Sequence, residues 1–187
     1  AAATVSVTVD GQTVTATNNG TTWNVADDML SAFADGTFDV TVTATDGVGN
    51  VGSDVTADEL TVDLTAPAVT VDSLTTGDST PALSGTIDDA AATVSVTVDG
   101  QTVTATNDGT TWNVADDVLS ALAEGTYDVT VTATDAVGNV ASDATSVELT
   151  VDLTAPAVTV DVLTTGDSTP ALSGTIDDAA ATVSVTV

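Results

Sequence analysis

The sequence predicts an all-β protein built from tandem copies of one 89-residue repeat, and three observations support this. Thr supplies about a fifth of the residues, a composition typical of strands. Apolar residues alternate with Thr and Ser at a period of two, between turns rich in Gly, Asp and Asn. The stretch that begins at Ala1 recurs at Ala90 and at Ala179, so the period is 90 − 1 = 89 and again 179 − 90 = 89.

The copies are nearly identical. Residues 1–89 and 90–178 differ at 11 positions, so 89 − 11 = 78 positions match. The chain begins and ends at the same phase of the repeat, in the middle of an expected strand, so we expect that its ends are not natural termini. We expect residues 1–62 to form a repeat that lacks its first strands, residues 63–151 a complete repeat, and residues 152–187 the first strands of the next.

The first half of the complete repeat contains four expected strands. Residues 68–71 and 82–87 alternate apolar and polar positions around the turn at 76–81, which contains Gly and Pro. The third strand places Val94, Val96 and Val98 on one face. Asp99-Gly100 is a strong hairpin signal, which returns the chain through residues 103–105.

The second half continues the pattern after a turn at 107–109. Trp112 and Val114 begin the next strand, the apolar stretch 118–122 crosses over, and residues 127–133 alternate up to a turn at 135–139. The last strand covers residues 147–151. Seven or eight short strands in about 90 residues are typical of an immunoglobulin-like β-sandwich, so the predicted architecture is a tandem array of such sandwiches.

The core of each repeat is expected to rest on stacked Val side chains and Trp112, since the chain has no Cys and therefore no disulfide. Tyr127, which follows a Gly-Thr turn, is a candidate for a tyrosine corner. The equivalent residue in the first copy is Phe38, which lacks the hydroxyl, so this bond is optional in the repeat.

The charge excludes several classes of function. The chain has 28 acidic residues and no Lys, Arg or His, which gives a formal net charge of −28. Nucleic acids, anionic membranes and P-loop nucleotide binding require basic residues that are absent. Without Cys and His, the usual zinc sites and thiol or imidazole catalysts are absent too. Because no apolar run approaches the roughly 20 residues of a membrane helix, we expect no direct membrane insertion.

The order of the strands predicts that acidic residues gather at one end of the repeat. If successive strands run in alternate directions, the linker 63–67, the Asp88-Asp89 turn and the turn 135–139 all lie at the same end of the repeat. This end faces the preceding repeat. Four carboxylates and an amide oxygen, with no cation in the sequence, suit calcium, which takes 6 to 8 oxygen ligands. The alternative is that these residues are ordinary turn formers on an acidic surface. The joint recurrence of all these positions favours calcium at each junction.

Four segments of the repeat are distinctive: residues 63–67 (DLTAP), 80–86 (TPALSGT), 125–135 (GTYDVTVTATD) and 137–140 (VGNV). They closely resemble the tandem bacterial Ig-like repeats of giant secreted adhesins, a family that includes biofilm-associated and RTX-type ice-binding adhesins. The resemblance implies a secreted protein on the cell surface, with calcium between domains that act as a rigid spacer for an adhesive tip. Carried over to this chain, the implied calcium ligands are Asp63, Asp88, Asp89, Asp135, Asn139, Asp46, Asn50, Asp152, Asp177 and Asp178. The complete lack of Lys and Arg departs from the family.

Three functions follow as hypotheses. The first is a non-enzymatic extender whose partners are the neighbouring repeats of the same chain, with lateral or end-to-end self-association into a filament as a variant. The second is ligand binding, to sugar or ice, through Thr rows such as those in 13–17 and 41–45. The third is a glycosidase that uses Asp27-Asp28 or Asp116-Asp117. We disfavour it, because adjacent residues of a strand point to opposite faces and cannot flank one bond.

Overall fold

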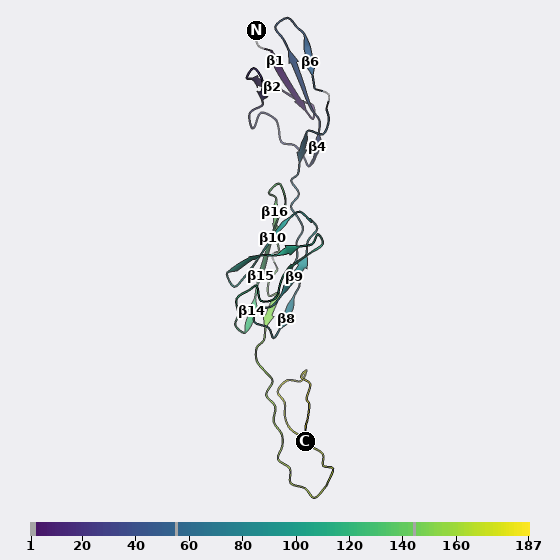
Figure 1. The fold of residues 1–187 in the computed structure, drawn as a ribbon, viewed down its shortest axis with the longest axis vertical. Helices are drawn as coiled ribbons and strands as arrows, with labels where there is room; N and C mark the ends of the chain where they lie inside the picture. The colour runs from purple at the N-terminus through teal and green to yellow at the C-terminus, as the bar shows by residue number, and fades with distance from the viewer. Residues whose placement is uncertain (1–2, 55, 144) are drawn as a thin grey trace. The chain divides into compact units, whose positions relative to one another are not determined.

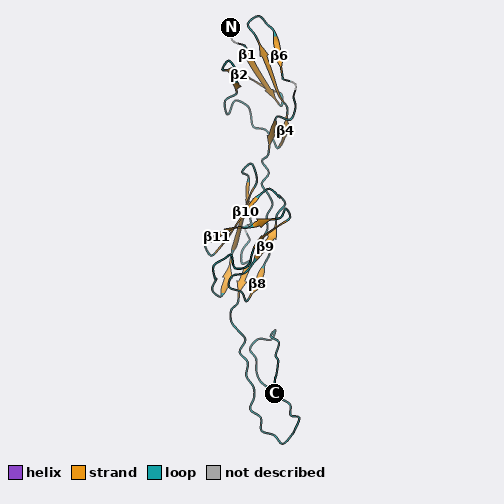
Figure 2. Cartoon of the chain, in the orientation of Figure 1, coloured by secondary structure: helices purple, strands orange, loops and turns teal. Residues whose placement is uncertain are grey.

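The computed structural model describes residues 3–54, 56–143 and 145–187. These residues form strands, turns and loops, with no helix among them (Figure 2). There is accordingly no helix in the described chain that is long and apolar enough to span a membrane. The predicted all-β class is confirmed.

The chain divides into two compact units, residues 1–67 with 134–140 (unit 1) and residues 68–133 with 141–187 (unit 2). The domain boundaries expected at 62/63 and 151/152 stay a prediction.

Unit 1 contains a five-stranded sheet in the order β3-β2-β1-β5-β6 and a separate two-stranded pair, β4-β7 (Figure 1). At the centre of the sheet, Val7 pairs with Val14 on one side and with Val42 on the other. The strands are β1 Thr4–Val9, β2 Gln12–Asn18, β3 Trp23–Asn24, β4 Gly36–Phe38, β5 Val40–Thr45, β6 Val51–Ser53 and β7 Leu60–Val62.

Unit 2 contains the strands of the complete repeat, in three sheets ordered β11-β10-β15-β16, β12-β13-β9 and β14-β17-β8. The pairing between β17 and β8 is parallel. The strands are β8 Leu74–Thr76, β9 Leu83–Thr86, β10 Thr93–Val98, β11 Gln101–Thr104, β12 Thr106–Asn107, β13 Thr111–Val114, β14 Gly125–Tyr127, β15 Val129–Thr134, β16 Val140–Ser142 and β17 Leu149–Val151.

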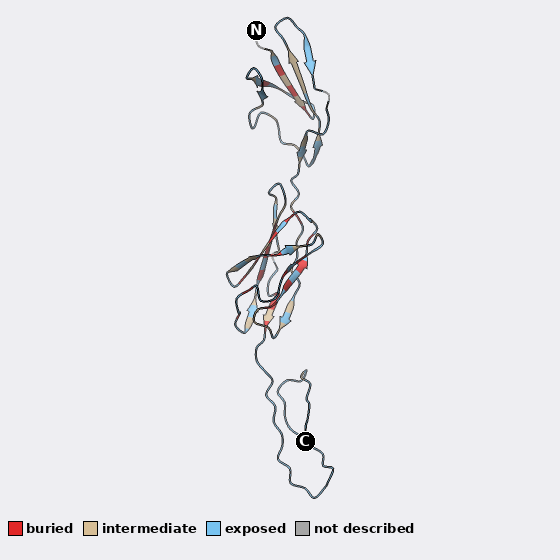
Figure 3. Cartoon of the chain, in the orientation of Figure 1, coloured by how far each residue is buried: buried red, intermediate tan, exposed pale blue. Residues whose placement is uncertain are grey.

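The core of the complete repeat lies between these sheets, as the buried segments in Figure 3 show. Val94, Val96 and Val98 of β10 are buried at alternate positions, as the sequence pattern predicts. They share one cluster with Leu83 of β9 and Trp112 of β13, which belong to another sheet. Side chains from facing sheets that meet in one cluster define a β-sandwich, so the predicted immunoglobulin-like architecture is confirmed.

Trp112 is the largest fully buried side chain, with none of its surface exposed. Its indole Nε1 donates a hydrogen bond of 2.8 Å to the carbonyl oxygen of Thr70. Gly85 makes this approach possible, because an added Cβ would overlap Thr70 O and lie 2.6 Å from Trp112 Nε1. The indole therefore packs directly on the backbone of the hairpin formed by residues 68–87.

Two parts of the strand pattern differ from the prediction. Residues 68–71 form only a bridge, between Val69 and Ile87, and the chain then crosses to pair as β8 with β17, which we had not expected. The hydrogen bonds to β9 continue through Thr70 N to Thr86 O at 3.1 Å and Asp72 N to Ser84 O at 2.9 Å, while Val71 N, on the other edge, donates to the Asp143 carboxylate at 2.8 Å. The last strand begins at Leu149 rather than at 147, and β16 was not predicted at all.

The predicted tyrosine corner is present in the complete repeat. The Tyr127 hydroxyl donates to the Ala123 carbonyl oxygen at 2.9 Å. In unit 1 the equivalent Phe38 instead packs on Phe33, with ring centroids 5.1 Å apart and planes tilted by 46°. Leu122 occupies the position equivalent to Phe33 in the complete repeat. The two copies thus use a hydroxyl bond or an aromatic pair at the same place.

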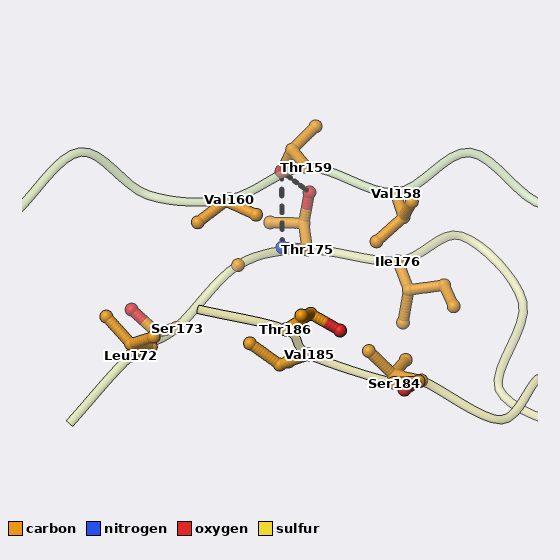
Figure 4. A pocket seen from close by; sticks show the side chains of 12 residues that line it. Val158, Thr159, Val160, Leu172, Ser173, Thr175, Ile176, Ser184, Val185 and Thr186 are labelled. Atoms are coloured by element: carbon orange, nitrogen blue, oxygen red, sulfur yellow. Dashed lines mark hydrogen bonds between the residues drawn. The ribbon is translucent and has the colours of Figure 1, made fainter.

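Unit 1 has a smaller core than the complete repeat. Among the residues that the structure describes, the buried side chains of its core cluster are Val5, Val7, Val9 and Ala16. Trp23, the counterpart of Trp112, is 44% exposed. The segment 152–187 in turn contains one bridge, between Val158 and Ile176, and leaves its apolar side chains exposed (Figure 4).

We predict that Gly85→Ala destabilises the complete repeat by about 1–3 kcal/mol or more, because the added methyl overpacks the contact between Trp112 and Thr70. Denaturant unfolding followed by Trp fluorescence measures this. Gly77→Ala is the matched control, since its Cβ would meet only Asp152 O at an ordinary 3.5 Å. Equal stabilities of the two variants would contradict the account.

Candidate functional site

The predicted ligand turn at 135–139 is a closed loop around one carboxylate. Asp135 Oδ1 accepts hydrogen bonds from the backbone N–H groups of Val137, Gly138 and Asn139 at 2.7–2.9 Å. Asp135 Oδ2 accepts a bond of 2.7 Å from Asn139 Nδ2. This is the local pattern that makes Asp a turn former. The equivalent turn in the first copy uses the same bonds between Asp46 and Asn50, at 2.7 and 2.9 Å.

These bonds set the ionisation of both carboxylates. Burial acts to raise the pKa of Asp135, but the bonds from the Asn139 side chain and from three backbone N–H groups outweigh it and hold the pKa below its ordinary value. The pKa of Asp46 is lowered in the same way, mainly by the side chain of Asn50. Both groups are stabilised as carboxylates by neutral donors, since the chain has no cationic side chain.

Asn139 also joins this turn to the linker. Its Nδ2 donates a second bond, of 3.0 Å, to the carbonyl oxygen of Asp63. Both amide hydrogens of Asn139 are thereby used, and its Oδ1 faces no donor in the described chain. The predicted meeting of linker and turn at one pole is therefore present for Asp63, Asp135 and Asn139, all within unit 1.

The Asp88-Asp89 turn lies beside the start of the hairpin in unit 2. Asp88 Oδ1 accepts from Ala68 N at 2.7 Å, and Asp88 N donates to Ala68 O at 3.2 Å. Asp89 Oδ1 accepts from Ala91 N at 2.7 Å. One oxygen of Asp88 therefore closes the base of the hairpin, and one oxygen of Asp89 forms a local turn.

The remaining predicted ligands make the same kind of bond. One carboxylate oxygen accepts a backbone N–H at 2.8–3.0 Å in Asp63, Asp152, Asp177 and Asp178. In the part of the chain that the structure describes, no three acidic side chains are grouped closely enough to hold a metal ion. These bonds form turns, or at Asp88 and Asp177 close the base of a hairpin, and the role of all these residues as calcium ligands stays a prediction.

A carboxylate pair that the sequence did not reveal lies between Asp78 and Asp116, 38 positions apart. The pKa of Asp116 is raised, first because its protonated carboxyl donates a hydrogen bond to Asp78 and then because Asp78 is negatively charged. The pKa of Asp78 is lowered, first by the Thr80 backbone N–H, against burial, with the bond to Asp116 adding to it. The Thr80 hydroxyl donates to the neighbouring Asp117 at 2.8 Å.

The structure overturns our strand-based argument against a glycosidase. Asp27-Asp28 and Asp116-Asp117 lie in turns, not on strands. Asp28 and Asp117 have φ = 62°, in the left-handed region, so the strand argument about opposite faces does not apply to them.

Glu148 is a second feature that the sequence did not reveal. Its side chain is 4% exposed, and Oε2 accepts from Val129 N at 3.0 Å. Oε1 is buried with no hydrogen-bond partner in the described chain. Burial acts to raise the pKa of Glu148, but the Val129 N–H and the Thr145 hydroxyl lower it overall. The repeat pattern places this Glu beside a polar run and gives no signal of its burial.

We predict that Asp135 stabilises the fold only where it is ionised. Its folded pKa lies below the ordinary value of 3.8, so its contribution is present above pH 3.8 and is lost as the pH falls through the folded pKa. Asp135→Asn should therefore lower the melting temperature at neutral pH, and the difference from the wild type should shrink in acid. Thermal unfolding across pH measures it, and a difference that is independent of pH would contradict the assignment.

Comparison with known proteins agrees with this architecture. Residues 67–153 match the family described as Bacterial Ig-like domain. No curated protein matches the sequence.

Among solved structures, one concerns the host cell surface retention of a 1.5-MDa bacterial ice-binding adhesin. It is 27% identical with a TM-score of 0.46, and the match covers 85% of this chain and 56% of that one. A tetra-tandem repeat in the extending region of a large adhesion protein is 28% identical with a TM-score of 0.41, covering 93% and 54%. The chain thus spans little more than half the length of these two structures. Residues 67–153 of this chain thus match the bacterial Ig-like domain family, and the flanking residues carry further copies of the same repeat.

Proposed function

We propose that this chain is part of the extender region of a large bacterial surface adhesin, located outside the cell, with a mechanical rather than an enzymatic role. The observation that carries the proposal is the repeat itself: an Ig-like domain recurs with 78 of 89 positions unchanged. A spacer needs length and sameness, and in a linear array each copy interacts mainly with its neighbours. The partners of each repeat are therefore the adjoining repeats of the same chain.

We further propose that calcium stiffens the junctions between repeats. In the carboxylates of Asp63, Asp88 and Asp89, one oxygen accepts a backbone hydrogen bond and the other is left to bind a cation. Asn139 donates hydrogen bonds through Nδ2, which leaves its Oδ1 to bind a cation as well. No Lys or Arg is present to neutralise these groups, so a hard divalent cation is the ion of suitable chemistry. Binding would have to draw these carboxylates together, because the described residues contain no preformed group of three.

The test compares thermal unfolding in millimolar calcium, in chelator, and in magnesium at equal ionic strength. A ligand at 100 times its dissociation constant that binds only the folded state adds about 2.7 kcal/mol, so we expect a clear calcium-specific rise in melting temperature. Asp88→Asn should abolish this rise, because it removes one charge and keeps an oxygen for the Ala68 N–H.

Asp99→Asn is the matched control for this test. It makes the same change of charge in the hairpin turn, where Asp99 has φ = 49°, a conformation that Asn adopts readily. It should leave the calcium effect intact. Equal effects of calcium and magnesium on the wild type would refute the junction sites and leave the repeat fold unaffected.

A second function is favoured by the hydroxyl rows on the sheet of unit 1. Across β2, β1 and β5, hydroxyl residues pair in register in two adjacent rows, Thr13-Thr8-Thr41 and Thr15-Ser6-Thr43. Such a face could bind sugar or ice, although Thr is also common on wet strand faces and Thr8 and Thr13 bond to each other at 2.9 Å. Glycan binding or inhibition of ice growth that is lost in Thr13→Val with Thr41→Val would establish it, and inactivity of the wild type would exclude it.

A further inference from the structure

The two copies of the repeat differ by a single chemical group in one turn. Residues 18–22 and 107–111 have the same sequence except at Asn19, whose counterpart is Asp108. An amide and a carboxylate have the same shape, so the first turn becomes the second when one NH₂ group is replaced by oxygen. Asn19 precedes Gly20, and this is the one Asn-Gly step in the sequence. Asn is a chemically labile residue, and we therefore compared the two turns in detail.

The backbone of the turn is the same in both copies. Asn19 N donates to Thr22 O at 2.8 Å, as Asp108 N donates to Thr111 O at 3.1 Å. The glycine that follows has φ = 95° in the first copy and 103° in the second. Asn19 and Asp108 are both exposed, so this position stays open to water in the complete repeat as well as in unit 1. A carboxylate at position 19 therefore fits the existing turn.

The complete repeat shows how this turn holds a carboxylate. Asp108 Oδ1 accepts from Thr111 N at 2.9 Å, and the Thr111 hydroxyl lies 2.9 Å from each carboxylate oxygen. The Thr111 N–H, and after it the hydroxyl, hold the pKa of Asp108 below its ordinary value. The amide of Asn19 instead donates from Nδ2 to Asn24 Oδ1 at 3.2 Å. The turn thus offers closer partners to the acid than to the amide.

We propose that Asn19 is a site of spontaneous deamidation, through which the turn of unit 1 acquires the carboxylate that the complete repeat already has. The backbone nitrogen of Gly20 loses its proton and attacks Asn19 Cγ, the bond from Cγ to Nδ2 breaks, and ammonia leaves with that proton. The product is a five-membered succinimide. Water then adds to one of its two carbonyl groups and opens the ring to aspartate or isoaspartate. The net reaction consumes one water and releases one ammonia.

The residue after each Asn selects Asn19 for this reaction. Gly20 has no side chain to obstruct the attack of its nitrogen. Four other Asn residues precede a Val, whose β-branched side chain crowds the nitrogen. They are Asn24, Asn50, Asn113 and Asn139. Deamidation at Asn19 adds one negative charge to a chain that already has 28 acidic residues.

One hydrogen bond restrains the reaction. Gly20 N donates to Asn18 Oδ1 at 2.8 Å, and this bond must break before the nitrogen can attack. The same bond is present in the complete repeat, from Gly109 N to Asn107 Oδ1 at 2.9 Å. The folded turn therefore slows deamidation relative to the unfolded chain without preventing it.

The test follows the purified 187-residue chain by mass spectrometry during incubation at mildly alkaline pH. A protease that cuts before Asp releases residues 10–26, a peptide that contains Asn18, Asn19 and Asn24. The unmodified peptide should decrease with time. It should be replaced by cleavage at the new aspartate and by a heavier, uncut form with isoaspartate at position 19. The rate should rise with pH, because the attacking nitrogen must lose a proton, and should be higher in denaturant.

Two variants provide the matched arms. Asn19→Gln keeps an amide, but its longer side chain disfavours the five-membered ring, so its mass should stay constant. Asp108→Asn creates a second Asn-Gly step in the same turn of the complete repeat. This variant should deamidate at position 108 and so regain the wild-type sequence in its aspartate fraction.

Three results would overturn the proposal. The first is a folded wild type that keeps its amide at Asn19 while the chain in denaturant loses it. The second is deamidation at Asn24 or Asn113 that is as fast as at Asn19. The third is an Asp108→Asn chain whose new amide persists while Asn19 of the same molecule reacts.

Discussion

The packing of one indole on one hairpin is the interaction on which the repeat depends. Trp112 is fully buried and bonded to Thr70 O, and Gly85 gives it room. The chain has no disulfide, and only 3% of its residues are aromatic, so this ring is the largest single contribution to a core made mainly of Val. In unit 1, as described, the counterpart Trp23 is 44% exposed and the core cluster has fewer buried side chains. The 89-residue repeat is therefore a unit that needs its first strands to close.

Electrostatics is the second constraint, since 28 acidic residues have no cationic side chain to pair with. The fold stabilises these charges locally, because backbone N–H groups and Asn side chains donate hydrogen bonds to carboxylates in turns, as at Asp135 and Asp46. These neutral donors hold the pKa of both groups low, so the charge persists near neutral pH. The chain consequently stays strongly anionic, which supports the proposal of divalent cations at the junctions.

Much of this could be predicted from the sequence because it is local or periodic. The alternating Val residues of β10, the Asp99-Gly100 hairpin and the turn at Asp135 all appear where the pattern places them. The features that were missed depend on residues distant in sequence. The segment after residue 72 leaves the hairpin and pairs as β8 with β17, and Asp78 meets Asp116 across 38 positions. The same limit applies to the proposed calcium site: each turn can be predicted from a short motif, whereas the meeting of several turns depends on residues far apart in the sequence.

The central claim is that the repeats act as a stiff spacer, and the most direct measurement is the length of tandem arrays in solution. Small-angle X-ray scattering on arrays of increasing repeat number, with calcium and with chelator, gives their maximum dimension. The account predicts that in calcium this dimension grows in proportion to the number of repeats. Growth that follows only the square root of the number, as for flexibly linked domains, in calcium as well as in chelator, would contradict it.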